Sequence, residues 1–170
     1  MSFITKTNGK GEGYTTNDMI YTPDHIAKMI IDLLPIKPDD RVYDPFFGQG
    51  AFYNQFPECI KFWSEIQKGK DFFDFDEHVD WIVSNPPYSI FDDVMRHSYE
   101  LADNIVYLIP LNKITSSMKR LRELKKYGGI YKLWILPASK CGFPFGFPAC
   151  VLWLKKDYKG AFNPVLWGVK

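Results

Sequence analysis

Short apolar runs, each closed by a polar or turn residue, recur along the chain after residue 40. Apolar runs of about four to eight residues between turn signals are typical of buried strands. The six runs are Arg41–Asp44, Ile60–Glu65, Trp81–Asn85, Asn104–Pro110, Tyr131–Pro137 and Ala149–Lys156. The earlier runs alternate with stretches that favour helices, namely Gly50–Gln55, Ile90–Ala102 and Ser116–Tyr127. Alternating strands and helices predict an α/β fold with a mostly parallel sheet that is covered on both faces.

A further helix is predicted ahead of the first strand. Thr22-Pro23 is typical of an N-cap followed by a proline in the first helical position. Apolar residues from Ile26 to Leu34 follow at helical spacing, and Pro35 ends the helix. Residues 1–20 are rich in glycine, threonine and asparagine, and we expect them to be a flexible N-terminal segment.

The last two runs are expected to pair with each other. Only residues 138–148 separate them, and this segment of Gly, Pro and Phe leaves no room for a helix. Strands joined without a crossover helix are antiparallel. Residues 160–170 are expected to add a final strand at the edge of the sheet.

Length and composition fit a single folded domain over residues 21–170. The chain has 170 residues, of which 46% are apolar and 17% are aromatic, as in globular proteins. No apolar run approaches membrane-spanning length, and the polar start lacks the apolar stretch of a signal peptide. Three widely spaced cysteines argue against a disulfide framework or a zinc cluster. We therefore expect a cytoplasmic protein with no bound metal and no membrane partner.

Charge is distributed unevenly along the chain, although the net charge is only +1. Residues 1–110 carry 9 Lys and Arg against 18 Asp and Glu, whereas residues 111–170 carry 12 against 2. A basic C-terminal third suggests a face that binds a polyanion. A solvated surface with no partner explains the same pattern equally well.

Polar residues stand at or just beyond the ends of the first three predicted strands. They are Asp44, Glu65, Asp71 and Asn85, and in open parallel sheets ligands bind at this edge. Residues 44–50, with the sequence DPFFGQG, form a glycine turn that lets a ligand approach the backbone. The turn lacks the G-x-G-x-x-G spacing of a dinucleotide site, which disfavours a dehydrogenase. One such acid alone is more often a solvated group or a helix cap, but three beside a glycine turn favour a ligand site.

The segment Ser84-Asn85-Pro86-Pro87-Tyr88 gives the sharpest chemical signal. Its two prolines stiffen the backbone directly after a buried strand. An adenine amine is a poor nucleophile, and two fixed acceptors, the Asn85 side-chain oxygen and the Pro86 carbonyl, can direct its lone pair toward a methyl donor. The Tyr88 ring offers a surface on which an extruded base can lie. The alternative is a proline-rich turn with a core tyrosine.

Residues 44–50 followed by Asn85–Tyr88 resemble the amino-methyltransferases of the class I S-adenosylmethionine-dependent fold, especially the DNA adenine-N6 methyltransferases. The similarity spans about residues 20 to 156, in the order of the subgroup whose cofactor motif precedes the catalytic one. The resemblance implies a Rossmann-like domain with a mostly parallel, seven-stranded type of sheet and a terminal antiparallel strand. It implies methyl transfer from S-adenosylmethionine to N6 of a flipped adenine in DNA by direct in-line displacement, with S-adenosylhomocysteine as product.

The resemblance also implies a role for individual residues. The implied catalytic residues are Asn85, Pro86, Pro87 and Tyr88. The implied cofactor-binding residues are Tyr21, Thr22 and Pro23 at the methionine end, Asp44, Pro45, Phe46, Gly48 and Gly50 around the amino acid moiety, Glu65 on the ribose, Asp71 and Phe72 on the adenine, and Asn85. Phe143 or Phe145 falls where the family often places a second aromatic ring against the target base.

Two features depart from the family pattern. Only five residues separate Glu65 from Asp71, too few for the helix and full strand usually found there, so one sheet edge is expected to be cropped. The chain also has no room for a separate target-recognition domain after the motif-bearing core. Sequence selectivity is then expected to be short, to reside in loops, or to come from a partner protein, as in a phage-type or solitary enzyme.

The segment Lys113–Lys126 is predicted to be an amphipathic helix that holds DNA phosphates. Its Met118, Leu121 and Leu124 have helical spacing and are expected to pack inward. The cations expected to point outward are Lys113, Lys119, Arg120, Arg122, Lys125 and Lys126. Residues 140–147 mix a lysine with three phenylalanines, which suits either a base-contacting hairpin or a hydrophobic loop that closes the core.

Three alternatives to DNA adenine methylation stay open at this point. The chemistry of Asn85–Tyr88 also suits adenine in RNA and the amide of a protein glutamine, although the glutamine-modifying enzymes typically carry an additional N-terminal domain. The third alternative is a subunit that keeps the fold but only binds nucleic acid or an active partner. Intact Asp44, Asn85 and Tyr88 argue against such an inactive subunit.

Overall fold

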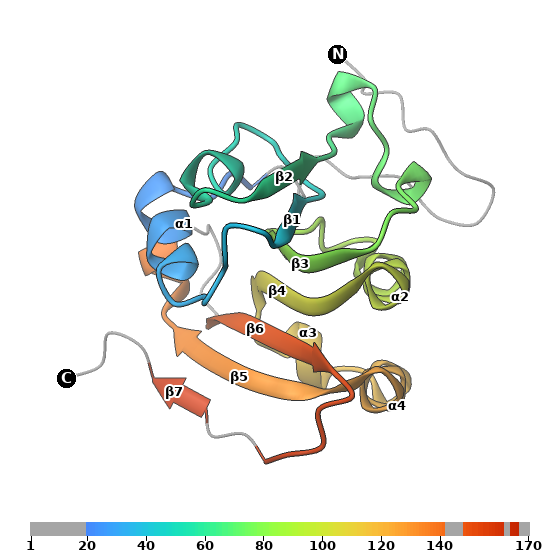
Figure 1. Cartoon of the computed structure of the whole chain (residues 1–170). Coiled ribbons are helices and arrows are strands. Elements are labelled where there is room, and N and C mark those ends of the chain that lie inside the picture. The colour runs from blue at the N-terminus through green and yellow to red at the C-terminus, as the bar shows by residue number, and fades with distance from the viewer. Residues whose placement is uncertain (1–19, 142–147, 162–163, 167–170) are drawn as a thin grey trace.

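The computed structural model describes residues 20–141, 148–161 and 164–166, and Figure 1 shows their arrangement. The strands are β1 (Arg41–Asp44), β2 (Ile60–Trp63), β3 (Val79–Ser84), β4 (Ala102–Pro110), β5 (Gly128–Leu136), β6 (Ala149–Lys156) and β7 (Pro164–Leu166). The α-helices are α1 (Asp24–Ile31), α2 (Phe91–Leu101), α3 (Asn112–Thr115) and α4 (Met118–Tyr127). Short 3₁₀ helices are η2 (Tyr53–Gln55), η3 (Ile66–Lys68), η4 (Phe72–Asp74) and η5 (Ala138–Cys141). None of the helices in these ranges is both long and apolar enough to cross a membrane.

The seven strands form one sheet in the order β2-β1-β3-β4-β6-β5-β7. Strands β2, β1, β3 and β4 are parallel neighbours, and β7 is parallel to β5. Strand β6 runs antiparallel to both β4 and β5, so the predicted antiparallel pair is confirmed. The expected edge strand near the C-terminal end is β7. The predicted mostly parallel α/β sheet is therefore confirmed.

Alternate residues of the central strands enter two separate cores because successive side chains in a strand point to opposite faces. In β3, Trp81 and Val83 pack on the face that carries α1, whereas Ile82 packs on the opposite face. Strand β4 repeats the pattern, with Val106 on the α1 face and Tyr107 on the other. Figure 1 shows α1 on one side of the sheet and α2 and α4 on the other. The apolar runs are nearly continuous because both faces are covered.

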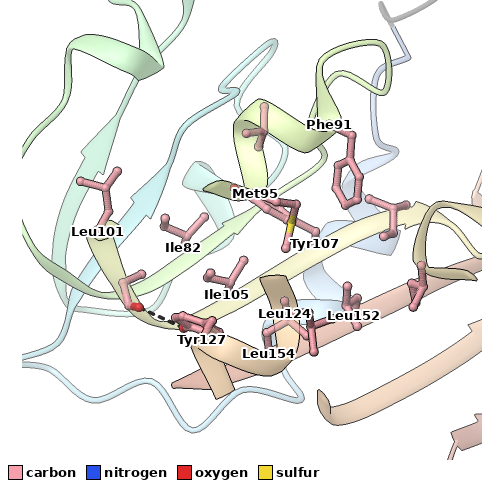
Figure 2. Packing of buried hydrophobic residues seen from close by; sticks show 14 of the residues in the cluster. Ile82, Phe91, Met95, Leu101, Ile105, Tyr107, Leu124, Tyr127, Leu152 and Leu154 are labelled. Atoms are coloured by element: carbon pink, nitrogen blue, oxygen red, sulfur yellow. Dashed lines mark hydrogen bonds between the residues drawn. The ribbon is translucent and has the colours of Figure 1, made fainter. Parts of the chain in front are cut away.

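Helices α2 and α4 close the second core, which Figure 2 shows. Phe91, Met95 and Leu101 of α2 are at most 4% exposed and lie at helical spacing. Burial of each such side chain contributes about 1.5–3 kcal/mol. Helix α4 adds Leu124 and also Tyr127, whose hydroxyl donates a 2.9 Å hydrogen bond to the Ala102 carbonyl (Figure 2). This packing fixes α4 against the start of β4.

The first helix begins one residue later than predicted. Helix α1 starts at Asp24, and Pro23 has extended backbone angles (φ −61°, ψ 140°) that place it at the N-cap. Thr22 therefore does not cap the helix. Its hydroxyl oxygen instead accepts a hydrogen bond from the Asn85 side chain. The α-helix also ends at Ile31, with a turn carrying the chain to Leu34.

The sheet edge at β2 is cropped, as the short spacing predicts. Between Glu65 and Asp71, all of which is described, the chain forms only η3 and a single bridge from Glu65 to Lys70. The α-helix predicted near Gly50–Gln55 is wrong, because this segment forms only the 3₁₀ helix η2. The turn at residues 44–50 and the proline at position 57 leave only residues 51–56 for a helix in this crossover.

Candidate active site

The carboxyl ends of β1, β2 and β3 meet at one edge of the sheet because the three strands are parallel neighbours. Asp44 ends β1 and pairs with Trp63 of β2, so Ser64 and Glu65 continue the chain beside the glycine turn. Ser84 ends β3 and donates from its Oγ to Asp44 Oδ1 at 2.6 Å. The structure thus brings the predicted strand-end residues together.

Asp44 is the most deeply placed group of this edge. Its side chain is buried with 0% exposure, and besides Ser84 its Oδ1 accepts from the Phe46 N–H at 3.4 Å. Its Oδ2 is buried and has no hydrogen-bond partner among the described residues. Burial raises the pKa of the Asp44 carboxyl from 3.8 to about 7, and the hydrogen bond from Ser84 only partly offsets this. The Asp44 carboxyl therefore changes its charge near neutral pH, well above the range of an ordinary aspartate.

The glycine turn is shaped by two residues with positive φ. Gly48 (φ +52°) donates its N–H to Glu65 Oε2 at 2.8 Å, which ties the turn to the end of β2. A Cβ on Gly48 would lie 3.4 Å from the half-exposed Tyr21 ring. At Gly50 (φ +87°), a Cβ would come within 2.7 Å of Asn54 Nδ2. Any other side chain at Gly50 would strain the backbone and displace its neighbour.

Contacts from outside its own loop fix the Asn85 amide. Its Nδ2 donates to the Ile20 carbonyl at 3.1 Å and to Thr22 Oγ1 at 3.2 Å. A carbonyl can only accept, so the group that faces Ile20 is the NH₂ of the amide. Oδ1 consequently faces the other way, where it accepts from the Tyr88 hydroxyl at 2.9 Å. This orientation presents an acceptor oxygen directly after β3.

Of the predicted adenine pair, the structure brings Asp71 to a cleft but buries the ring of Phe72. A cleft of about 400 Å³ opens beside β2, and Ser64 and Asp71 are among the residues that line it. Asp71 Oδ1 accepts from the Phe73 N–H at 3.0 Å and so caps η4. Phe72 is 1% exposed, with its ring centroid 5.1 Å from that of Phe46.

The cations of the predicted DNA-binding helix separate into two groups. Lys119, Arg122, Lys125 and Lys126 are exposed on or beside α4, as predicted. The prediction that Arg120 points outward is wrong, because its side chain is 10% exposed and pairs with Asp92 of α2 at 2.6 Å. The inward packing predicted for Met118 is also wrong, since it is 64% exposed.

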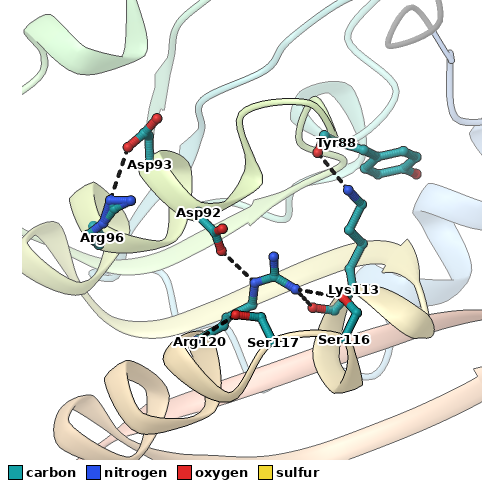
Figure 3. Close-up of polar contacts among 8 residues, drawn as sticks. All are labelled: Tyr88, Asp92, Asp93, Arg96, Lys113, Ser116, Ser117 and Arg120. Carbon is teal, nitrogen blue, oxygen red and sulfur yellow. Dashed lines mark hydrogen bonds and ion pairs between the residues drawn. The ribbon is translucent and has the colours of Figure 1, made fainter. Parts of the chain in front are cut away.

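Lys113 also differs from the expectation. It lies on the separate short helix α3 rather than on α4, and its Nζ donates to the Tyr88 carbonyl at 2.9 Å (Figure 3). Phe143 and Phe145 lie outside the described residues. Sequence reasoning gave no role to Ser84 and did not find the contact between Thr22 and Asn85. A serine at the end of an apolar strand beside the proline motif was the available signal for Ser84.

Solved structures of other proteins identify the fold. A modification subunit of a putative type I restriction enzyme from Vibrio vulnificus has a TM-score of 0.66 at 14% identity, covering 91% of this chain and 49% of that chain. A putative class I S-adenosylmethionine-dependent methyltransferase from Listeria monocytogenes gives 0.63 at 14% identity, covering 91% and 68%. The fold is that of the class I methyltransferases. The 23S rRNA methyltransferase ErmE has it too, with a TM-score of 0.63 at 13% identity over 83% of this chain and 73% of that chain.

The sequence comparison gives a match to one family over part of the chain. The family model of the N-6 DNA methylases matches residues 2–73. Those residues carry the glycine turn, Glu65 and Asp71, whereas Asn85–Tyr88 lies beyond them. Among curated protein sequences, none matches the chain. The predicted resemblance to the DNA adenine-N6 methyltransferases is confirmed, and the chain spans about half the length of the Vibrio subunit.

Proposed function

We propose that this chain methylates the exocyclic N6 amine of adenine in DNA, with S-adenosylmethionine as the methyl donor. The observation that carries the proposal is the orientation of the Asn85 amide at the end of β3. Ile20 and Thr22 engage its Nδ2, so Oδ1 is presented as an acceptor. The match of residues 2–73 to the N-6 DNA methylases supports both an amine as the methylated group and DNA as the substrate.

The chemistry follows from two fixed acceptors. Asn85 Oδ1 and the Pro86 carbonyl accept the two N–H bonds of the amine, so the nitrogen becomes pyramidal and its lone pair is freed from the ring. Because these oxygens are oriented in advance, they stabilise the positive charge that develops on nitrogen without reorganising. The cofactor supplies an electrophilic methyl carbon on a sulfonium sulfur. The methylated nitrogen then loses one proton to solvent. The remaining task of the protein is to align nitrogen, carbon and sulfur in a line.

Tyr88 has two tasks in this proposal. Its ring is half-buried and offers a stacking surface for an adenine taken out of the helix. Its hydroxyl holds Asn85 Oδ1 at 2.9 Å before substrate binds. An amide oxygen has two lone pairs, so it accepts the amine while it keeps this bond. Pro86 and Pro87 are buried and stiffen the link between Asn85 and Tyr88.

The residues present fit a cationic cofactor. The buried Asp44 Oδ2, without a partner among the described residues, is satisfied by the ammonium of the methionine moiety. Glu65 lies beside Gly48 at the β2 end, where it suits the ribose hydroxyls. The other cofactor contacts in the proposal are Tyr21, Thr22 and Pro23, Pro45, Phe46 and Gly50 in the glycine turn, and Asp71 in the cleft near the adenine. Phe72 is proposed to act indirectly, because its buried ring packs against Phe46.

DNA binding is assigned to the exposed cations of α4. Lys119, Arg122, Lys125 and Lys126 are available for phosphate oxygens, which position a protein without reading sequence. A partner protein is proposed to supply sequence recognition, since the Vibrio relative is a subunit by its description. We also infer a cytoplasmic site of action, because the substrate is DNA and all three cysteines are free.

A labelled transfer assay tests the proposal. The chain is incubated with methyl-labelled S-adenosylmethionine and either DNA or RNA of the same sequence, and the products are digested to nucleosides. We expect the label in N6-methyladenine from DNA. The likeness to ErmE makes RNA adenine the second candidate, and label confined to the RNA sample would favour it. Label in protein or in no product would overturn the proposed function.

A further inference from the structure

A nearly buried arginine joins three helices beside the proposed catalytic motif. Arg120 of α4 donates from Nε to Asp92 Oδ1 of α2 at 2.6 Å. Its Nη1 donates to the Lys113 carbonyl of α3 and lies 3.4 Å from Ser116 Oγ. The guanidinium carbon also lies 5.2 Å from the ring centroid of Phe91. Figure 3 shows this arrangement, in which the guanidinium faces α2 and α3 instead of solvent.

The contact continues from Lys113 into the motif. Lys113 Nζ donates to the Tyr88 carbonyl at 2.9 Å, and the Tyr88 hydroxyl donates to Asn85 Oδ1 at 2.9 Å. Tyr88 is thus held at both its main chain and its ring. Hydrogen bonds thus link Asp92, Arg120, Lys113, Tyr88 and the Asn85 amide in turn, through different atoms of Lys113 and of Tyr88.

Side-chain donors matter here because the motif has few donors of its own. Residues 85–87 have no regular secondary structure. Pro86 and Pro87 carry no N–H, so no ladder of backbone hydrogen bonds can hold the segment in place. Carbonyls of such a segment need donors from elsewhere, and Lys113 is the donor for Tyr88.

We propose that Lys113 and Arg120 are positioning residues for Asn85–Tyr88 and do not bind phosphate. Arg120 fixes the main chain of α3 by its bond to the Lys113 carbonyl, and the Lys113 ammonium then fixes the main chain of Tyr88. The proposal rests on the proposed function for its catalytic consequence, but the restraint itself is a property of the ligand-free chain. A Lys113 that served only to bind phosphate could be replaced without loosening residues 84–90, so the two roles are distinguishable.

Hydrogen exchange of the ligand-free protein tests the restraint without any assumption about activity. Lys113→Met removes the donor but keeps an unbranched apolar stem, and Lys113→Arg restores a cationic donor. We expect faster amide exchange in the peptide spanning residues 84–90 of Lys113→Met and partial recovery in Lys113→Arg. The control is Lys37→Met, an exposed lysine ahead of β1 at the opposite end of the strands, which should match the wild type. Unchanged exchange in Lys113→Met would overturn the proposal.

Methyl transfer supplies the second readout. For Lys113→Met, kcat should fall by about 10- to 100-fold, since a misplacement of about 1 Å costs that much, while the cofactor Kd stays unchanged. Arg120→Lys keeps the charge but loses the forked donor, and it should show a smaller loss of the same kind. A flatter salt dependence of DNA binding for Lys113→Met, with normal exchange and kcat, would show a phosphate contact and overturn the proposal. Faster exchange in Lys113→Met, with no methyl transfer even by the wild type, would refute the proposed function but uphold the restraint.

Discussion

The strand-end site and helix α4 use polar side chains in opposite ways. At the strand ends, Asp44, Glu65 and Asn85 are each tied to named partners from distant parts of the chain. On α4, most cations are exposed, and a solvated lysine contributes little to stability. Arg120 is the exception on α4, because it is built into the packing of α2 and α3. The presence of fixed partners, more than residue type, therefore distinguishes a side chain that shapes the candidate site from one that stays exposed.

The largest expected effect on cofactor binding belongs to Asp44. Asp44→Asn keeps the shape and the acceptor for Ser84 but removes the negative charge offered to the cofactor. Loss of a charge-assisted hydrogen bond costs about 1.5–3 kcal/mol, so the cofactor Kd should rise about 10- to 100-fold. Calorimetric titration with S-adenosylmethionine measures this, and wild-type affinity in a folded variant would remove Asp44 from the cofactor site.

The same residue should make stability depend on pH. Burial raises the pKa of Asp44 to about 7 in the folded chain, whereas its ordinary value is 3.8. Between these values the folded state binds more protons, so the free energy of unfolding falls as pH rises from about 4 to 7 and is then level. The loss is on the order of 4 kcal/mol, because one pKa unit corresponds to about 1.4 kcal/mol. Asp44→Asn should abolish this loss and be more stable than the wild type at pH 8.

Urea unfolding at several pH values checks this expectation. The control is Asp39→Asn, which changes an exposed carboxyl just ahead of β1 and should keep the wild-type pH profile. A ligand-free Asp44→Asn that loses stability at pH 8 would mean that the carboxylate is needed in its ionised form. In that case Asp44 would be a structural anion instead of a group held ready for a cation.

The smallest effects are expected on α4. Replacement of Lys119, Arg122 and Lys125 by glutamine should weaken DNA binding about equally on all sequences. The slope of log affinity against log salt should flatten by up to about 0.9 for each phosphate that the variant no longer binds. Cofactor affinity should stay unchanged, since these exposed side chains belong to α4 and not to the segments that follow β1, β2 and β3. An unchanged slope would make this face of α4 a solvated surface.

The features that could be predicted from the sequence are those that depend on the pattern of neighbouring residues. Apolar runs with turn signals gave the strands, and the five-residue spacing after Glu65 gave the cropped edge. The polar residues that follow the strands lie close together because the carboxyl ends of neighbouring parallel strands are at the same edge of the sheet. Pattern did not separate Arg120 from Lys119, since both are cations on one short helix. Arg120 is buried against partners that include Asp92, 28 residues away, and such a partner is visible only after folding.

Thr22 illustrates the same limit. A threonine ahead of a proline and an apolar periodicity is typical of an N-cap. In the structure its hydroxyl instead accepts from Asn85, 63 residues away, and helps to turn the amide. The roles of single residues in the site stay predictions until variants are measured.

The most direct test of the account is a paired measurement on the wild type and Asn85→Ala. Cofactor Kd and kcat for methyl transfer to adenine in DNA are measured on the same preparations. We predict a kcat reduced by about 100-fold or more and a much smaller change in Kd, because the acceptor that orients the amine is lost while Asp44 and Glu65 keep their places in the cofactor site. Near-normal turnover in Asn85→Ala would contradict the account, since the oriented amide would then have no part in the chemistry.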